Sequence, residues 1–252
     1  MNEWLVLVIS FAIALFYSSV GFGGGSSYLA ILSLLLIDFY EIRTLALLLN
    51  IVVVSIGTWM SIRKQVFDWR LFWPFLVFSV PMAFLGAQLR LSAVAFFLVL
   101  GVSLILSALF LLWQSMRHVP AERSLTLPKR SVLGGSIGFL SGLVGIGGGI
   151  FLSPVLNVFG WANPRKVAAL ASVFILVNSL SGLIGLLYAQ TFQVNWTSGF
   201  PIIAAVAFGG LVGSYFSNEK FNLRVIRLLT AILVAYVGTR LVLQYGFQLF
   251  PS

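Results

Sequence analysis

Two glycine-rich stretches are the parts of this sequence best suited to bind a ligand. They read V-G-F-G-G-G over residues 20–25 and V-G-I-G-G-G over residues 144–149, and both lie within otherwise apolar sequence. Glycine inside a helix costs about 1 kcal/mol relative to alanine, so three consecutive glycines are expected to interrupt a helix. The helix that restarts after each interruption presents unpaired N–H groups and the positive end of its dipole, and both features favour an anion.

Hydroxyl and amide side chains near the two stretches can hydrogen bond an oxyanion together with those N–H groups. We expect the N–H groups of residues 23–26 and 147–150 to lie nearest the anion. The candidate substrate-binding residues are Gly21, Gly23, Gly24, Gly25, Ser26, Ser27, Asn50, Gly145, Gly147, Gly148, Gly149, Ser172 and Asn178.

Close helix packing is the competing interpretation of the same residues. Gly21 and Gly25, like Gly145 and Gly149, have the G-x-x-x-G spacing found where membrane helices approach closely. Serine and asparagine side chains also bond to the preceding turn of their own helix. The occurrence of two copies at equivalent positions favours breaks that line a substrate site.

The composition identifies an integral membrane protein. Of the 252 residues, 60% are hydrophobic and 8% are charged, with a mean hydropathy of +1.07, whereas about 25% of residues are charged in a soluble domain. A backbone interrupted inside a membrane must line a cavity or be buried in protein, because lipid cannot satisfy its N–H and C=O groups. The net charge of +9 comes from basic residues in short loops, which favours membrane orientation over nucleic-acid binding.

The side chains that enzymes use are scarce. The chain has no cysteine and one histidine, His118, in its most polar stretch, which excludes disulfides and thiolate metal sites. We therefore expect no enzyme, no catalytic or metal-binding residues and no cofactor. We also expect no proton relay, because the charged residues closest to the apolar segments are predicted at helix ends; these are Asp38, Glu41, Arg43, Arg165 and Lys166.

An internal duplication organises the chain. Trp69, Pro74 and Gly86 recur as Trp196, Pro201 and Gly213 at an offset of 127, and the glycine stretches recur at an offset of 124. Such agreement between unusual residues indicates two repeats. We assign residues 1–113 to the first transmembrane repeat, 114–130 to a cytoplasmic linker and 131–252 to the second repeat.

Each repeat is predicted to be all-α, with a glycine-broken pair of short helices followed by three spanning helices. The expected helices are 4–17, 28–37, 44–62, 71–87 and 93–113 in the first half, and 132–143, 150–160, 167–188, 197–216 and 223–245 in the second.

The glycine-broken pair admits a single interrupted crossing or a hairpin that returns to the same side. Residues 132–143 and 150–160 would each reach about 17 Å, half of a 30 Å hydrocarbon core, which favours the hairpin. Cytoplasmic loops collect Lys and Arg, and the hairpin splits these residues twelve to two, whereas the single crossing splits them seven to seven. The twelve are Arg63, Lys64, Arg70, Arg117, Arg123, Lys129, Arg130, Arg165, Lys166, Lys220, Arg224 and Arg227; the two are Arg43 and Arg90.

Loops at equivalent positions of the two halves also reverse in charge. Residues 63–69 are basic on balance, whereas residues 189–196 carry no charge. This reversal predicts repeats of inverted topology. We expect a multi-pass protein of the plasma (inner) membrane, with the linker in the cytoplasm and both termini outside.

The residues described so far resemble the sulfite exporter TauE/SafE family, also called the 4-toluenesulfonate uptake permease family. The resemblance rests on the paired V-G-[FI]-G-G-G motifs, on residues 164–172 (P-R-K-V-A-A-L-A-S) and on residues 209–214 (G-G-L-V-G-S). It covers nearly the whole chain and implies a membrane transporter for sulfite, sulfonates or related organic anions. The first half departs from the pattern, since residues 45–50 lack the Ala-Ser pair seen at Ala171 and Ser172.

The leading hypothesis is a transporter that moves a small anion by alternating access. A non-transporting membrane subunit that stabilises a partner protein is the alternative, although it leaves the duplicated breaks without a role. The expected partners are a small anionic substrate and the lipid bilayer, with no nucleic acid, and the pattern leaves homo-oligomerisation open.

Overall fold

The computed structural model describes residues 3–20, 23–35, 38–63, 65–66, 69–116, 126–160, 164–215 and 223–247. Within these ranges the regular structure is helical, which confirms the predicted all-α class. The helices are α1 (Glu3–Val20), α2 (Gly25–Leu35), α3 (Phe39–Arg63), α4 (Trp69–Gln88), α5 (Ala93–Met116), α6 (Leu127–Val144), α7 (Gly149–Val158), α8 (Pro164–Tyr188), α9 (Trp196–Tyr215) and α10 (Leu223–Gly246).

The helices of the two halves agree in order and in length. α1 and α6 have 18 residues each, α3 and α8 have 25, α4 and α9 have 20, and α5 and α10 have 24. The short helices α2 and α7 have 11 and 10 residues. Each predicted segment therefore corresponds to one observed helix.

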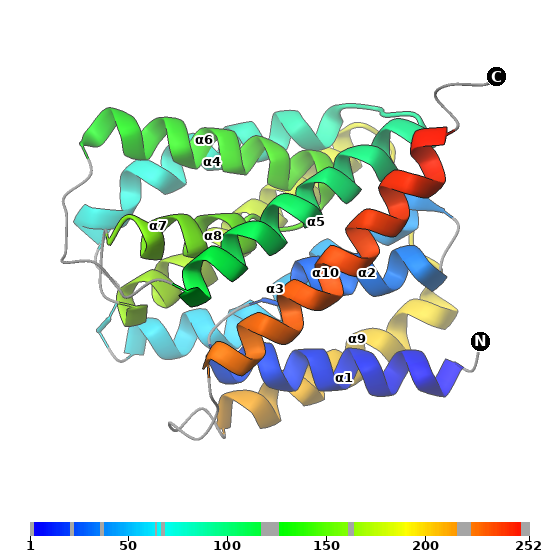
Figure 1. Ribbon diagram of the computed structural model, residues 1–252, viewed down its shortest axis with the longest axis horizontal. Coiled ribbons are helices and arrows are strands. Elements are labelled where there is room, and N and C mark those ends of the chain that lie inside the picture. The colour runs from blue at the N-terminus through cyan, green and yellow to red at the C-terminus, as the bar shows by residue number, and fades with distance from the viewer. Residues whose placement is uncertain are drawn as a thin grey trace.

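The packing of the helices is also reciprocal between the halves. α6 packs on α4 as α1 packs on α9, and α5 lies along α10. Glycines allow the close approach: Gly138 and Gly142 of α6 lie on the backbone of Ser79 and Ala83, and Gly213 of α9 lies on Leu15. In Figure 1, α1 begins and α10 ends toward the right, whereas α5 ends and α6 begins toward the left. The short helices α2 and α7 are largely buried beside α3 and α8.

The structure corrects the predicted length of α6, which begins at Leu127 and not at residue 132. Thr126 has an extended backbone and Pro128 stands in the first turn, a position where proline favours helix initiation. At 1.5 Å per residue, α1 and α6 each reach about 27 Å, close to a full hydrocarbon core. The prediction that a helix of the pair crosses only half of the hydrocarbon core holds for the returning helices α2 and α7, and it is wrong for α6.

Five helices among the described residues are long and apolar enough to cross a membrane, namely α3, α5, α8, α9 and α10. α4 was also predicted to span, and it has the same length as α9. Among the described residues, its apolar part is Phe72–Gln88. The predicted linker also shrinks, since residues 114–116 belong to α5 and residues 127–130 to α6.

Candidate functional site

The two glycine breaks lead into their helices with the same local geometry. Gly24 and Gly148 precede α2 and α7 with φ of +74° and +82°, a left-handed conformation that favours glycine. The carbonyl of Gly24 accepts hydrogen bonds from Ser27 and Tyr28 at 2.9 and 3.0 Å, and the carbonyl of Gly148 accepts the equivalent bonds at 3.1 Å. The N–H groups ahead of each first hydrogen-bonded turn form the positive end of that helix.

Asn50 of α3 holds the two breaks together. Its side chain is fully buried, and Nδ2 donates to the carbonyl of Ile146 in the second break over 3.1 Å. The same amide lies against Gly25 at the start of α2, where an added Cβ would meet its atoms at 2.5 Å. Ile175 of α8 touches both breaks from the other side, at Gly23 and Gly149. The crossing of α3 and α8 therefore fixes the position of both helix starts.

A cavity of about 50 Å³ lies where the breaks meet. A buried water needs about 10–15 Å³ by this measure, so the cavity has room for a few waters or one small polyatomic ion. Its lining combines the first residues of α2 and α7 with side chains of α1, α5, α8 and α10. The lining residues are Tyr17, Gly23, Gly24, Gly25, Ser26, Leu111, Gln114, Ile146, Gly149, Ile150, Ser153, Pro154, Ile175, Arg227 and Thr230.

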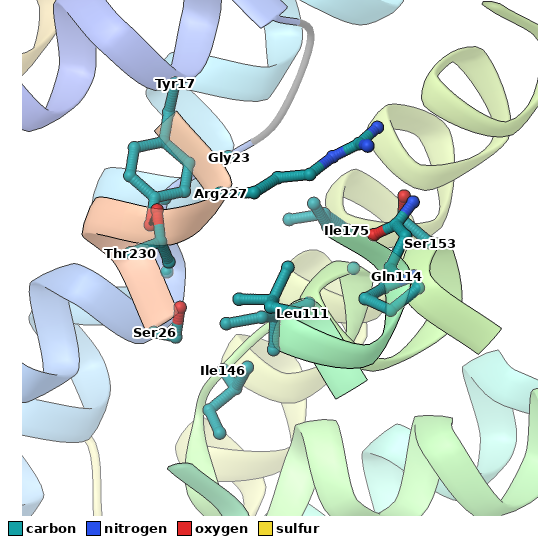
Figure 2. A pocket seen from close by; sticks show the side chains of 15 residues that line it. Tyr17, Gly23, Ser26, Leu111, Gln114, Ile146, Ser153, Ile175, Arg227 and Thr230 are labelled. Carbon is teal, nitrogen blue, oxygen red and sulfur yellow. Dashed lines mark hydrogen bonds between the residues drawn. The ribbon is translucent and has the colours of Figure 1, made fainter. Parts of the chain in front are cut away.

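Arg227 brings a positive charge to this cavity, which was not expected from the sequence. Figure 2 shows its side chain leaving α10 and reaching away from Tyr17, toward the side where Ser153 and Gln114 lie. Its Nε is buried and has no hydrogen-bond partner among the described residues. On the opposite side of the cavity, the Tyr17 hydroxyl donates to Thr230 Oγ1 at 2.7 Å and lies 2.6 Å from Ser27 Oγ. The site therefore pairs two helix N-termini with an unsatisfied guanidinium donor.

The structure also corrects the predicted surroundings of Arg43, which was expected to be solvated near a helix end. Its side chain is only 2% exposed and lies between the last turns of α4 and α6. The guanidinium donates to the carbonyl of Gly142 at 2.6 Å and to those of Gly86 and Ala87 at 3.1 and 3.0 Å. Carbonyl groups at a helix C-terminus carry partial negative charge, so they stabilise the cation without a carboxylate.

The structure brings most of the predicted glycines together but separates the side chains. Gly23, Gly24, Gly25, Ser26 and Gly149 line the cavity. The others are outside the lining: Gly147 lies against Asn50 of α3 and Ile175 of α8, Gly148 against Phe174 of α8 and Ile137 of α6, and Gly145 against Arg43. Gly21 falls outside the described residues. Three other predicted residues are also outside the lining: Ser27 bonds to Tyr17, and Ser172 and Asn178 bond to carbonyls of their own helix, Ala168 and Phe174.

The packing interpretation is correct for the space around the glycines. A Cβ at Gly148 would meet Phe174 at 2.8 Å and Ile137 at 3.0 Å, and a Cβ at Gly149 would meet Ile175. The Cβ of Gly148 would thus point into protein, whereas that of Gly149 would point at Ile175, which itself lines the cavity. Packing and cavity lining are thus compatible, because the absent side chains allow the breaks to dock while Gly23, Gly24, Gly25 and Gly149 still line the cavity.

Sequence reasoning missed Tyr17, Gln114, Arg227 and Thr230. Arg227 and Thr230 are three residues apart on α10, so they share one helix face in an apolar segment. That spacing was the feature of the sequence that could have indicated a polar site on α10. It was overlooked because Arg227 was counted among the loop residues that set membrane orientation.

Comparisons with known proteins identify the family. The family described as sulfite exporter TauE/SafE matches residues 6–241. A probable membrane transporter protein of Sinorhizobium fredii is 32% identical over 247 residues, covering 95% of this chain and 98% of the relative. A probable membrane transporter protein of Methanocaldococcus jannaschii is 28% identical over 251 residues, covering 93% of each chain. No solved structure matches the chain. The chain therefore belongs to the sulfite exporter TauE/SafE family of membrane transporters.

Proposed function

We propose that this chain moves a small anion, such as sulfite, a sulfonate or a related organic anion, across the plasma membrane by alternating access. The observation that carries the proposal is the cavity at the meeting point of the breaks, which combines two helix N-termini with Arg227. A buried anion without donors would cost several kcal/mol, and these groups supply the missing donors. The family's description as a sulfite exporter supports an oxyanion.

An inverted pair of repeats is the architecture that we propose for this movement. The equal helix lengths and the reciprocal packing support it. The directions of the helices in Figure 1 agree, since α1 and α3 run from right to left while α6 and α8 run from left to right. Repeats of opposite direction can open a central site first to one side and then to the other. With the basic linker in the cytoplasm, both termini would face outside.

Uptake of radiolabelled sulfite into proteoliposomes that contain the purified chain tests this function. We expect saturable uptake above that of protein-free liposomes, reduced by an excess of methanesulfonate if both anions share the site. Arg240→Gln is the matched control, because Arg240 is exposed on α10 outside the cavity lining and its replacement should leave uptake unchanged. Failure to observe saturable uptake or exchange of sulfite, methanesulfonate and acetate would contradict the proposal.

A further inference from the structure

The equal lengths of the paired helices define which residue in one half corresponds to each cavity residue in the other. α3 and α8 start at residues 39 and 164, an offset of 125, so Ile175 corresponds to Asn50. α5 and α10 start at residues 93 and 223, an offset of 130, so Thr230 corresponds to Leu100. The glycine breaks have an offset of 124, so Tyr17 corresponds to Ser141.

Two of the corresponding residues bond to the second break: Ser141 accepts the N–H of Gly145 over 2.8 Å, and Asn50 donates to the carbonyl of Ile146 over 3.1 Å, and we call their side of this break the far side. Leu100, Ser141 and Asn50 are each 0% exposed. Two polar atoms on the far side, Ser141 Oγ and Asn50 Oδ1, are buried and have no hydrogen-bond partner among the described residues. Buried polar atoms normally have a partner, so two such atoms on residues that bond to the same break call for a physical explanation.

Arg43 joins the elements that surround Ser141. Its guanidinium ties the last turn of α6, at Gly142, to the last turn of α4, at Gly86 and Ala87. Ser141 is the residue before Gly142, and its carbonyl accepts the N–H of Gly145 in the second break over 2.8 Å. The Arg43 side chain also touches Gly145. The contact therefore fixes α4, α6 and the second break at one point.

The loop between α8 and α9 covers the start of α3 at the same end. The backbone N–H of Asn195 donates to Glu41 Oε1 at 3.3 Å, and that of Gln193 donates to Thr44 Oγ1 at 3.4 Å. Arg90 donates to the carbonyl of Ala189 at 2.6 Å. The contacts of Glu41 and Thr44 lie beside Arg43 in the chain, so this loop is fixed to the same end of α3.

We propose that Arg43 is the latch of the far gate, and that Ser141 and Asn50 line the anion path when this gate opens. The inference rests on the proposed function. In the opposite-facing state the guanidinium leaves the carbonyls of Gly86, Ala87 and Gly142 and becomes available to the passing anion. Ser141 Oγ then donates to that anion, and the Arg227 cavity closes on the other side. Each side of the path would thus use one arginine, from non-equivalent positions of the two repeats.

Cysteine labelling tests the latch, because the native chain contains no cysteine. Ser141→Cys reports on the far gate and Gln114→Cys on the cavity. Each cysteine substitution is made singly, once in the chain with the native Arg43 and once in the Arg43→Gln variant. Both proteins are then labelled from each side of membrane vesicles with an impermeant maleimide. We expect Gln114→Cys to be labelled from one side only, and Ser141→Cys weakly from either side.

Arg43→Gln should raise the labelling of Ser141→Cys from the far side by about tenfold, the population change produced by about 1.4 kcal/mol of lost hydrogen bonding. It should also lower the labelling of Gln114→Cys. Arg43→Lys keeps the charge with fewer directed donors and should give an intermediate shift. A gate should change the labelling of Ser141→Cys and Gln114→Cys in opposite directions. A general loss of helix packing would instead increase the labelling at both positions.

Three results would overturn the latch. These are unchanged labelling in Arg43→Gln, increased labelling at both positions, or loss of the folded protein in both Arg43 variants, which would assign Arg43 to the fold alone. The proposed function fails by a different result, the absence of anion uptake by the native chain. A native chain that transports sulfite while Ser141→Cys stays unlabelled in Arg43→Gln would sink the latch and leave the transporter intact.

Discussion

Arg43 and Arg227 differ in whether their hydrogen-bond donors are available to an anion, because their surroundings differ. Arg43 is surrounded by carbonyl groups at the ends of two helices, and its donors are used within the protein. Arg227 lines a cavity and retains a buried donor without a partner. An anion entering the cavity would satisfy Arg227, whereas it would have to displace carbonyl groups to reach Arg43. Arg227 is therefore the residue on which anion affinity should depend most.

Arg227→Gln is expected to raise the KM for sulfite by about 10- to 100-fold, because a hydrogen bond to a charged group contributes about 1.5–3 kcal/mol. Uptake into proteoliposomes over a range of sulfite concentrations measures it. Arg240→Gln serves as the control and should keep the native KM, since Arg240 is exposed outside the cavity lining. Equal KM values in the two variants would remove Arg227 from the binding site.

Asn50 and Asn178 provide a second comparison at the residue scale. Asn50 donates to Ile146 in the opposite repeat, whereas Asn178 donates to Phe174 in its own helix. Asn50→Leu should lower the thermal stability in detergent and the rate of sulfite uptake, since an unsatisfied buried carbonyl costs about 1–3 kcal/mol. Asn178→Leu should have the smaller effect on uptake. The reverse order would show that Asn50 does not position the breaks.

At the scale of single elements, the sequence predicted helix identity better than helix ends. Glycine runs correctly marked the breaks before α2 and α7, because left-handed backbone at Gly24 and Gly148 restricts those positions. The start of α6 was missed because Thr126 and Pro128 were read as linker, although proline in a first turn favours a helix. The cavity side chains were harder to predict, since they come from helices that meet only through tertiary packing.

Gly148→Ala tests the left-handed start of α7. The backbone there has φ of +82°, and the new Cβ would meet Phe174 at 2.8 Å. A left-handed non-glycine residue costs about 1–2 kcal/mol, so the melting temperature should fall. Gly135→Ala in α6 is the control: its Cβ would make an ordinary contact with Met82 at 3.6 Å, and alanine favours the helix. A melting temperature for Gly148→Ala at or above that of Gly135→Ala would contradict this account.

At the scale of the whole molecule, the two halves agree in the order and length of their helices and differ in their polar side chains. Paired helices have equal lengths, yet Asn50 stands opposite Ile175 and Thr230 opposite Leu100. The duplication could be recognised from sequence because tryptophan, proline and glycine are retained at constant offsets. The polar asymmetry could not be assigned a role, since it depends on which residues face the cavity and which are enclosed on the far side.

The orientation of the whole molecule can be tested at two exposed positions at opposite ends of α5 and α6. Ser92 precedes α5, and Thr126 precedes α6. Because α5 has 24 residues and reaches about 36 Å, the two positions should lie on opposite sides of the membrane. An impermeant thiol reagent should label Ser92→Cys in intact cells and Thr126→Cys only in inside-out vesicles. The opposite pattern would reverse the proposed topology.

The central claim is that an anion binds where the two glycine breaks meet. Anomalous X-ray diffraction at the selenium edge, from crystals soaked in selenite as a heavier analogue of sulfite, locates the anion directly. We expect a selenium peak bounded by Gly25, Gly149 and Arg227, which is lost in Arg227→Gln crystals. A peak on the protein surface beside Arg240, with none between the starts of α2 and α7, would contradict it.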